Sequence, residues 1–444
     1  MLRAVGLGDL KGQPARIQFT FWIMLVSAFF LFADQNLPAS NLSRIAASFG
    51  IFDAKEYRSL LGGWVSLPFF ILGGVVSVIY GRLADTIDRK KLLVTAVILG
   101  ELPCLLTGFT SDFWSYLVLR SLTGFGIGGV FPILFSLTGD LFRTENRPTA
   151  SAWVGLAMSL GMAFGQMFAG SIAHSTIFGL EGWRFSFIAV AVPAFPVVAL
   201  FYYFAQLPEH GAADEGAGKV DLEHNISFSM ESLTRVFRVK TNVLAFLQGI
   251  PGTIPWGFLF VFAVDFFEKN KGWDVNTGNT IVLLFGGMSI LGGFLGGFIG
   301  KKLYAANRRL FPAFCSLTVI VGAIPVFYLV NYQGESMLPA FIASFVGGLV
   351  VPMTGANVRA ILINTNLPEN RGAVFGFFNL TDDLGKGLGP FFIGLFVSVM
   401  PALAAYNLAI AMWIVCGLVW VGIVFTMNDD EDRVTEELRI RGKA

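Results

Sequence analysis

Charged residues are scarce in this sequence. Aspartate, glutamate, lysine and arginine make up 14% of its 444 residues, against about 25% in a typical soluble domain. Hydrophobic residues make up 55%, which is more than a water-soluble surface can accommodate. The net charge of +1 gives no sign of a nucleic acid or another strongly charged partner. The composition therefore excludes an ordinary soluble protein.

Cysteine and histidine are also rare, with three residues of each. The cysteines lie far apart and form no Cys-x-x-Cys pair, so the sequence offers neither a disulfide framework nor a zinc spacing. A membrane-embedded enzyme would need clustered His, Cys or Ser/His residues, and a pump driven by ATP would need a phosphate-binding loop. The sequence has neither feature, so we expect no enzyme activity, no metal and no cofactor.

Long hydrophobic runs are what the sequence has instead. Each is about 17–25 residues long, which matches the thickness of a bilayer. Lipid tails offer no hydrogen-bond partners to backbone N–H and C=O groups, so these runs predict helices, which pair those groups internally. We expect an all-α membrane protein with twelve transmembrane helices in two pseudo-symmetric six-helix bundles. The runs lie at 17–38, 59–80, 92–110, 113–139, 148–173, 183–205, 242–267, 277–300, 311–331, 337–363, 372–399 and 405–426.

One long polar segment separates the two sets of runs. Its first part is rich in glycine and reads as a flexible linker, and residues 229–240 have the pattern of an amphipathic helix on the membrane surface. The predicted organisation is an N-terminal bundle (1–205), a cytoplasmic linker (206–240), a C-terminal bundle (241–427) and a cytoplasmic tail (428–444).

Lysine and arginine gather in the loops on one side of the predicted spans. The positive-inside rule therefore places both termini in the cytoplasm. We expect a monomeric protein of a bacterial inner (plasma) membrane.

An internal repeat relates the two halves. Residues 128–170 resemble residues 348–394, with matching glycines, a matching proline and a Glu-Asn-Arg triplet that ends at Arg147 in one half and at Arg371 in the other. Corresponding elements of this kind are typical of duplicated transporter folds.

A pattern of glycine, acidic and basic residues joins the second and third spans. Residues 81–91 read Gly-Arg-Leu-Ala-Asp-Thr-Ile-Asp-Arg-Lys-Lys and resemble the signature loop of the major facilitator superfamily. Gly81 permits close helix approach, Asp85 can face the positive N-terminus of a helix from the other half, and Arg89 can neutralise it. The resemblance implies that these residues, with Lys90, form a cytoplasmic gate. The alternative is a loop that only sets membrane orientation.

Arg120 lies inside the fourth hydrophobic run, in a segment that resembles the Arg-x-x-x-Gly-x-Gly motif of the same superfamily. A charge there is costly, so we expect Arg120 to face a cavity and a carboxylate. A purely structural ion pair is the alternative.

The end of the first span resembles the spinster branch of that superfamily, in the stretch from Asp34 to Ile45 and again near residue 53. This resemblance implies transport of lysolipids or sphingolipid phosphates, with proton coupling at Asp34. Gln35 stands where the branch has Arg, and Ile127 stands where it has Glu. Gln166 replaces the proline of an export-associated motif, so the direction of transport stays open.

The eleventh span carries a second group of charges. Asp382 and Lys386 are four residues apart and can pair on one helix face. Asp383 then needs another partner, for which Arg359 of the tenth span is the candidate, and Asn379 lies one turn away. Charges inside a membrane mark function by default. A brace of salt bridges without proton traffic is the alternative.

Two further features complete the candidate residues. Glu101 lies in the third span and is a candidate for coupling or for the substrate cavity. The seventh span contains Gln248, Pro251, Pro255 and Trp256, and its prolines predict a broken helix that forms a hinge, lines a cavity or is simply kinked.

These features together predict a secondary active transporter. We expect alternating access, in which the two halves rock about a central cavity. The cavity would bind a small organic or amphipathic, lysolipid-like solute, and a proton would be the coupling ion. The rival hypothesis is a membrane sensor or scaffold that has a transporter fold but transports nothing.

Overall fold

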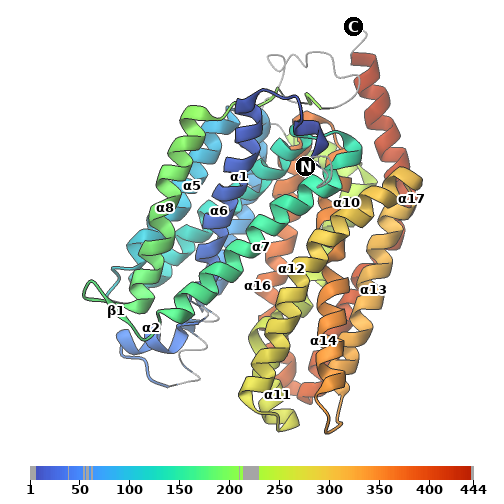
Figure 1. Cartoon of the computed structure of the whole chain (residues 1–444). Helices are drawn as coiled ribbons and strands as arrows, with labels where there is room; N and C mark the ends of the chain where they lie inside the picture. The colour runs from blue at the N-terminus through green and yellow to red at the C-terminus, as the bar shows by residue number, and fades with distance from the viewer. Residues whose placement is uncertain are drawn as a thin grey trace.

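The computed structural model describes residues 7–38, 40–53, 56, 60–61, 64–209, 211–213 and 230–441. Residues 214–229, in the middle of the predicted linker, lie outside the described residues. The described chain is almost entirely helical, and its long helices run roughly side by side in two groups (Figure 1).

The first group matches the first six hydrophobic runs. Its elements are η1 (Gly8–Leu10), α1 (Ala15–Ala33), η2 (Asp34–Asn36), α2 (Leu42–Ser48), α4 (Ser66–Thr86), α5 (Arg89–Thr107), α6 (Phe113–Leu141), η4 (Thr144–Asn146), α7 (Arg147–Ser171), β1 (Thr176–Ile177), β2 (Leu180–Glu181) and α8 (Gly182–Phe204).

The second group matches the remaining runs. Its elements are α9 (Met230–Arg238), α10 (Lys240–Gly257), η5 (Phe258–Phe262), α11 (Ala263–Lys271), α12 (Val275–Ala306), α13 (Leu310–Asn331), α14 (Leu338–Val350), η6 (Val351–Met353), α15 (Thr354–Asn364), η7 (Pro368–Asn370), α16 (Arg371–Val399) and α17 (Ala402–Arg441). The fold of twelve helices in two bundles is therefore as the sequence predicts.

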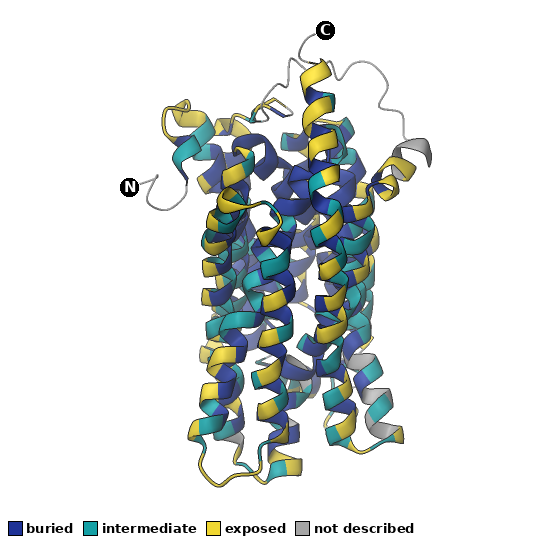
Figure 2. Ribbon diagram, turned by 90° about the vertical axis from the view of Figure 1, so that its right-hand side faces the viewer, coloured by how far each residue is buried: buried dark blue, intermediate teal, exposed yellow. Residues whose placement is uncertain are grey.

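Among the described residues, nine helices are long and apolar enough to cross a bilayer. The other three runs fall on α5 and α16, which carry charges, and on the interrupted pair α10 and α11. Apolar side chains such as Leu283 (68% exposed) and Phe425 (75%) are largely exposed. Exposed residues recur along the long helices (Figure 2), as is usual where lipid covers apolar side chains.

Polar caps mark the beginnings of two helices. The carboxylate of Asp88 accepts a hydrogen bond from the Lys90 amide (2.9 Å) at the start of α5. Asp112 accepts from the amides of Trp114 (2.9 Å) and Ser115 (3.0 Å) at the start of α6. These bonds satisfy amides that have no partner inside the helix.

We call the end of the molecule where α1 begins and α17 ends the basic end, because the Lys/Arg-rich α4–α5 and α12–α13 loops lie there. The opposite end carries α2, the β1–β2 hairpin and α11 (Figure 1). Helix α17 continues through the segment predicted to be a tail, so residues 428–441 extend the last helix beyond the bundle.

The contacts between the two halves follow the symmetry of the internal repeat. Helix α4, the second span, packs against α16, the eleventh, and α7, the fifth span, packs against α12, the eighth. The second span of each half thus meets the fifth span of the other. This exchange is what a duplicated fold with twofold pseudo-symmetry requires.

Glycines allow α7 to lie directly on α1. A Cβ atom on Gly161 would overlap the Phe29 carbonyl, and one on Gly165 would overlap the Ala33 carbonyl. The Gly-x-x-x-Gly spacing in this span therefore serves close helix packing.

The seventh span stays helical through both prolines and changes helical type after them. Helix α10 ends at Gly257, a π-helical turn (η5) follows, and α11 begins at Ala263. Pro251 and Pro255 precede the π-helical turn, and the indole of Trp413 donates to the Gly252 carbonyl (3.0 Å). This part of the span is thus held against α17.

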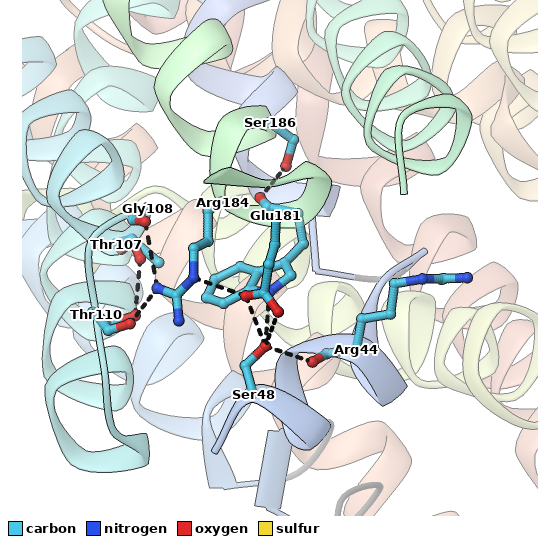
Figure 3. A network of polar contacts seen from close by, with 9 residues as sticks. Arg44, Ser48, Thr107, Gly108, Thr110, Glu181, Arg184 and Ser186 are labelled. Atoms are coloured by element: carbon cyan, nitrogen blue, oxygen red, sulfur yellow. Dashed lines mark hydrogen bonds and ion pairs between the residues drawn. The ribbon is translucent and has the colours of Figure 1, made fainter. Parts of the chain in front are cut away.

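A polar network fixes the opposite end of the first bundle (Figure 3). The Glu181 carboxylate accepts hydrogen bonds from the Ser48 hydroxyl (2.9 Å), the Trp183 indole (2.9 Å) and the Arg184 guanidinium (2.9 Å). Arg184 also donates to the Thr110 carbonyl. The network joins α2, the hairpin, α8 and the end of α5.

The pKa of Glu181 lies below its usual value, since these hydrogen bonds together outweigh the burial that alone would raise it. A lowered pKa stabilises the folded state above the unfolded-state pKa of about 4.3 and ceases to do so as the pH falls through the folded-state value.

We expect Glu181→Gln to lower the stability of the purified protein by about 0.5 kcal/mol at neutral pH, because the carboxylate is half exposed. Thermal unfolding in detergent at several pH values measures this, and the difference from the wild type should vanish in acid. Glu268→Gln, at an exposed position of α11, is the control. A difference that grows as the pH falls would contradict the prediction.

Candidate functional site

Asp85 joins the two halves at the basic end. It is 1% exposed, and its carboxylate oxygens accept hydrogen bonds from the amides of Gly372 (2.8 Å) and Ala373 (2.9 Å) in the first turn of α16. A helix N-terminus carries unpaired amides and a partial positive charge. The expectation that Asp85 faces a helix N-terminus of the other half is confirmed, and we call this contact the latch.

The backbones of α4 and α16 touch beside the latch. A Cβ on Gly81 would overlap the Gly372 carbonyl, and a Cβ on Gly372 would overlap the Gly81 carbonyl. One turn before Gly81 in α4, the hydroxyl of Ser77 donates a hydrogen bond to the Gly376 carbonyl (2.7 Å). Gly81 is therefore needed for contact between the halves, and this contact fixes the distance between Asp85 and its amides.

The other two residues expected in the gate have different partners. Arg89 forms an ion pair with Asp140 and donates to the Pro208 carbonyl (3.2 Å), so Asp85 is not its bonded partner. Lys90 donates to the Ala205 carbonyl (2.7 Å) at the end of α8. Lys90 thus holds two helices of the same half together, which corrects its expected place in the gate between halves.

Two arginines from the Glu-Asn-Arg triplets also cross between the halves. Arg147 donates to Asn364 (3.0 Å) of the second half, and Arg371 lies 3.5 Å from Asp140 of the first. Asp140 and Asn364 each stand seven residues before the arginine of their own half. The two contacts are therefore related by the repeat, with a carboxylate in one and an amide in the other.

Each of these arginines also donates to the carbonyl eight residues before it, Arg147 to Gly139 (3.0 Å) and Arg371 to Ile363 (3.2 Å). Neither arginine was singled out as a site residue from the sequence. The triplet that occurs in both halves was the signal that could have identified them.

The first half contains a buried acidic cluster within the span region. Ligating atoms of Asp34, Glu101 and Cys104 all lie within 4.8 Å of one another. Both carboxylates are 0% exposed, and their four oxygens have no hydrogen-bond partner in the part of the chain that the structure describes. Glu101 is therefore an immediate neighbour of Asp34.

Arg120 lies beside this cluster, as expected for a charge inside a span. It is 2% exposed, and its Nη2 atom lies 3.4 Å from the backbone carbonyls of both Asp34 and Gln35. Its guanidinium also stands over the rings of Phe69 (5.0 Å) and Phe187 (5.4 Å). Arg120 thus binds the backbone where α1 ends and supplies positive charge near the two acids.

The charges of α16 pair within their own helix. Lys386 lies 3.0 Å from Asp383 and 3.7 Å from Asp382, and the Asn379 amide donates to Asp383 (2.8 Å). The expected partner of Asp383, Arg359, is replaced by Lys386. At i+3 and i+4 the lysine reaches both acids, and the closer contact is with Asp383.

Arg359 instead reaches toward the first half. Its guanidinium stands over the rings of Phe131 (5.4 Å) and Phe135 (4.8 Å) of α6. Its Nε atom is buried and has no hydrogen-bond partner among the described residues. Arg359 therefore makes a cation–π contact between the halves.

The polar and aromatic residues of the seventh span face their own bundle. The Gln248 side-chain oxygen accepts from the Trp420 indole (3.2 Å) of α17. Trp256 packs against Phe285 and Trp413, with ring centroids 5.7 and 5.8 Å apart. Gln248 and Trp256 therefore fix α10 against its neighbours, and their expected role in a hinge or a cavity stays a prediction.

Replacing the carboxylate of the latch should weaken the contact between the two halves. We expect Asp85→Asn to destabilise the closed basic end by about 1–2 kcal/mol, because an ionised acceptor bound to two amides is replaced by a neutral one. Hydrogen exchange at the Gly372 and Ala373 amides should then quicken by about tenfold. Asp88→Asn, the same change in the adjacent helix cap, should leave both amides protected. Equal effects of the two variants would contradict the latch.

Comparisons with known proteins agree with this architecture. The family model described as Major Facilitator Superfamily matches residues 24–390. Protein spinster homolog 1 of Xenopus laevis is 22% identical over 389 residues, 84% of this chain and 71% of the relative. The sphingosine-1-phosphate transporter SPNS2 of Danio rerio is 23% identical over 377 residues, 82% of this chain and 73% of the relative.

Among solved structures, a bacterial homologue of the human lysosomal transporter Spinster, inward-facing and unoccupied, has a TM-score of 0.61 to this chain. The two are 18% identical, and the match covers 97% of this chain and 99% of the other. The resemblance to spinster proteins seen in the sequence is confirmed.

Proposed function

The chain belongs to the Major Facilitator Superfamily, and from that premise we propose that it is a proton-coupled secondary transporter of a small amphipathic solute. That it is a spinster-like membrane transporter for a small molecule, and no enzyme, follows from its family. The coupling ion, the solute and the orientation are our proposal.

The contacts at the basic end support alternating access. Besides the latch, the Lys301 ammonium of α12 donates to Asn146 of the first half (2.6 Å), and Arg147 and Arg371 cross between the halves. All of these groups lie at or near helix ends on the side where α1 begins. We propose that this is the closed end of an outward-facing state and that it faces the cytoplasm, as its basic residues favour.

One observation carries the proposal of proton coupling. Asp34 is completely buried inside a span, and neither of its carboxylate oxygens has a hydrogen-bond partner in the described chain. An ionised carboxylate without such partners is costly in a medium of low dielectric constant. Binding a proton removes that cost, so Asp34 is suited to take up and release a proton during the cycle.

The solute class rests on the charges of α16 and on the relatives. The side chains of Lys386 and Asp382 are 36% and 19% exposed, so both can meet a ligand while they remain paired. SPNS2, one of the relatives, is by name a sphingosine-1-phosphate transporter. We propose that an amphipathic, lysolipid-like solute places its polar head at Lys386 and Asp382.

We also propose that the protein works as a monomer in a bacterial inner membrane. Both halves that alternating access requires are contained in one chain, and the latch joins them without a second copy.

Asp34→Asn tests the coupling. The amide cannot exchange a proton, so we expect uptake of a lysolipid-like solute driven by a pH gradient into proteoliposomes to fall to background. Counterflow of the same solute, which needs no net proton movement, should continue because the latch and the α16 charges are unchanged. Wild-type pH-driven uptake in this variant would refute coupling through Asp34. Absence of counterflow in the wild type for every amphipathic solute tried would refute the solute class.

A further inference from the structure

We infer that Asp34 and Glu101 form a single proton site, in which the two carboxyl groups share one proton and Arg120 supplies the fixed counter-charge. The inference rests on the proposed function and deepens it, because it assigns a role to the third span. It also limits the number of protons that this site can carry to one.

The site is assembled from three separate elements. Asp34 comes from η2 at the end of the first span, Glu101 from the middle of α5, and Arg120 from α6. The two acids lie within 4.8 Å of each other, and both are completely buried. Besides their four oxygens, the Nη1 atom of Arg120 has no hydrogen-bond partner among the described residues. The four carboxylate oxygens and one guanidinium nitrogen thus meet without a hydrogen-bond partner among the described residues.

Close packing holds Glu101 in place. A Cβ on Gly126 of α6 would overlap the backbone of Gly100, and a Cβ on Gly100 would lie 3.1 Å from the Leu31 side chain of α1. Gly100, the residue next to Glu101, therefore packs directly on the backbone of α6 and against the Leu31 side chain of α1. Because α5 cannot move away, the two carboxyl groups remain adjacent.

The charges of the site determine how many protons Asp34 and Glu101 can bind together. Two ionised carboxylates and one arginine leave a net charge of −1 in a buried site, and like charges at this separation cannot both remain ionised at low cost. One proton makes the site neutral, whereas two would leave the arginine unbalanced. The pair therefore titrates as a unit with a single proton to gain or lose.

The other titratable groups that face the pair do not alter this count. Cys104 lies on α5 and Tyr116 on α6, and both are 0% exposed; a thiol and a phenol are neutral at physiological pH. A metal ion is disfavoured, because the positive charge of Arg120 repels it. A proton is the occupant that fits two acids beside an arginine.

Arg120 also links the proton to the protein's shape. Its guanidinium is within reach of the backbone carbonyls of Asp34 and Gln35, so it holds the end of the first span. When the proton leaves, the arginine faces two carboxylates and is drawn away from those carbonyls. Loss of the proton would therefore loosen the end of α1 from α6.

Glu101→Gln is the direct test, measured beside Asp34→Asn in proteoliposomes. Either change leaves one carboxylate with Arg120, which is neutral without any proton. We therefore expect pH-driven uptake to fall at least about tenfold in Glu101→Gln, as in Asp34→Asn, while counterflow continues. Glu268→Gln, at an exposed position outside the site, should behave as the wild type does.

Glu101→Asp guards against a folding defect. It keeps both carboxyl groups and the charge count but withdraws one by a methylene, so pH-driven uptake should persist with a displaced pH profile. A profile identical to the wild type, or undiminished pH-driven uptake in Glu101→Gln, would overturn the shared site even if Asp34→Asn is uncoupled. If Asp34→Asn stays coupled, or a sodium gradient drives uptake without a pH gradient, the proposed function itself fails.

Discussion

The need to neutralise buried charge in a medium of low dielectric constant governs this molecule. Three of its buried acids are compensated in three different ways. Asp85 is bound by the amides at the start of a helix, Asp140 by two arginines, and Asp383 by a lysine and an amide. Asp34 and Glu101 share one arginine between them, so compensation is incomplete there. A proton is the missing charge, and this deficit makes that site the natural place for coupling.

The duplicated frame explains why the compensated sites lie where they do. The second span of each half packs on the fifth span of the other, and the paired arginines make equivalent backbone contacts eight residues back. The charges do not follow this symmetry. Arg371 meets a carboxylate where Arg147 meets an amide, and the latch has its acid in the first half and its amides in the second. Function therefore divides between the halves: the latch acid and the proton site lie in the first, and the groups proposed for the solute lie in the second.

Much of the fold could be predicted from the sequence, and less of the site. Hydrophobic runs of bilayer length and two closely spaced prolines are local signals, so the spans and an irregular seventh helix were predictable. The latch was predictable because its motif combines a glycine with an acid at fixed spacing.

The partners of Arg89, Lys90 and Asp383 were not predictable, since each depends on how neighbouring helices are rotated. Residues at i+3 and i+4 share one helix face, so spacing could not choose between Asp382 and Asp383 for Lys386. The position of Glu101 depends on glycines that bring α5 onto α6. The sequence pattern of α5 alone does not indicate this contact.

A count of exchangeable protons shows whether Asp34 and Glu101 share a single proton. The infrared band of protonated carboxyl groups can be followed in the purified wild-type protein, reconstituted in lipid, as the pH is raised, and compared with Asp34→Asn and Glu101→Gln. We expect an amplitude of one carboxyl group in the wild type that is absent from both variants, because each variant is neutral without a proton. An amplitude of two groups in the wild type, or one group remaining in either variant, would show that the acids titrate independently and would contradict the account.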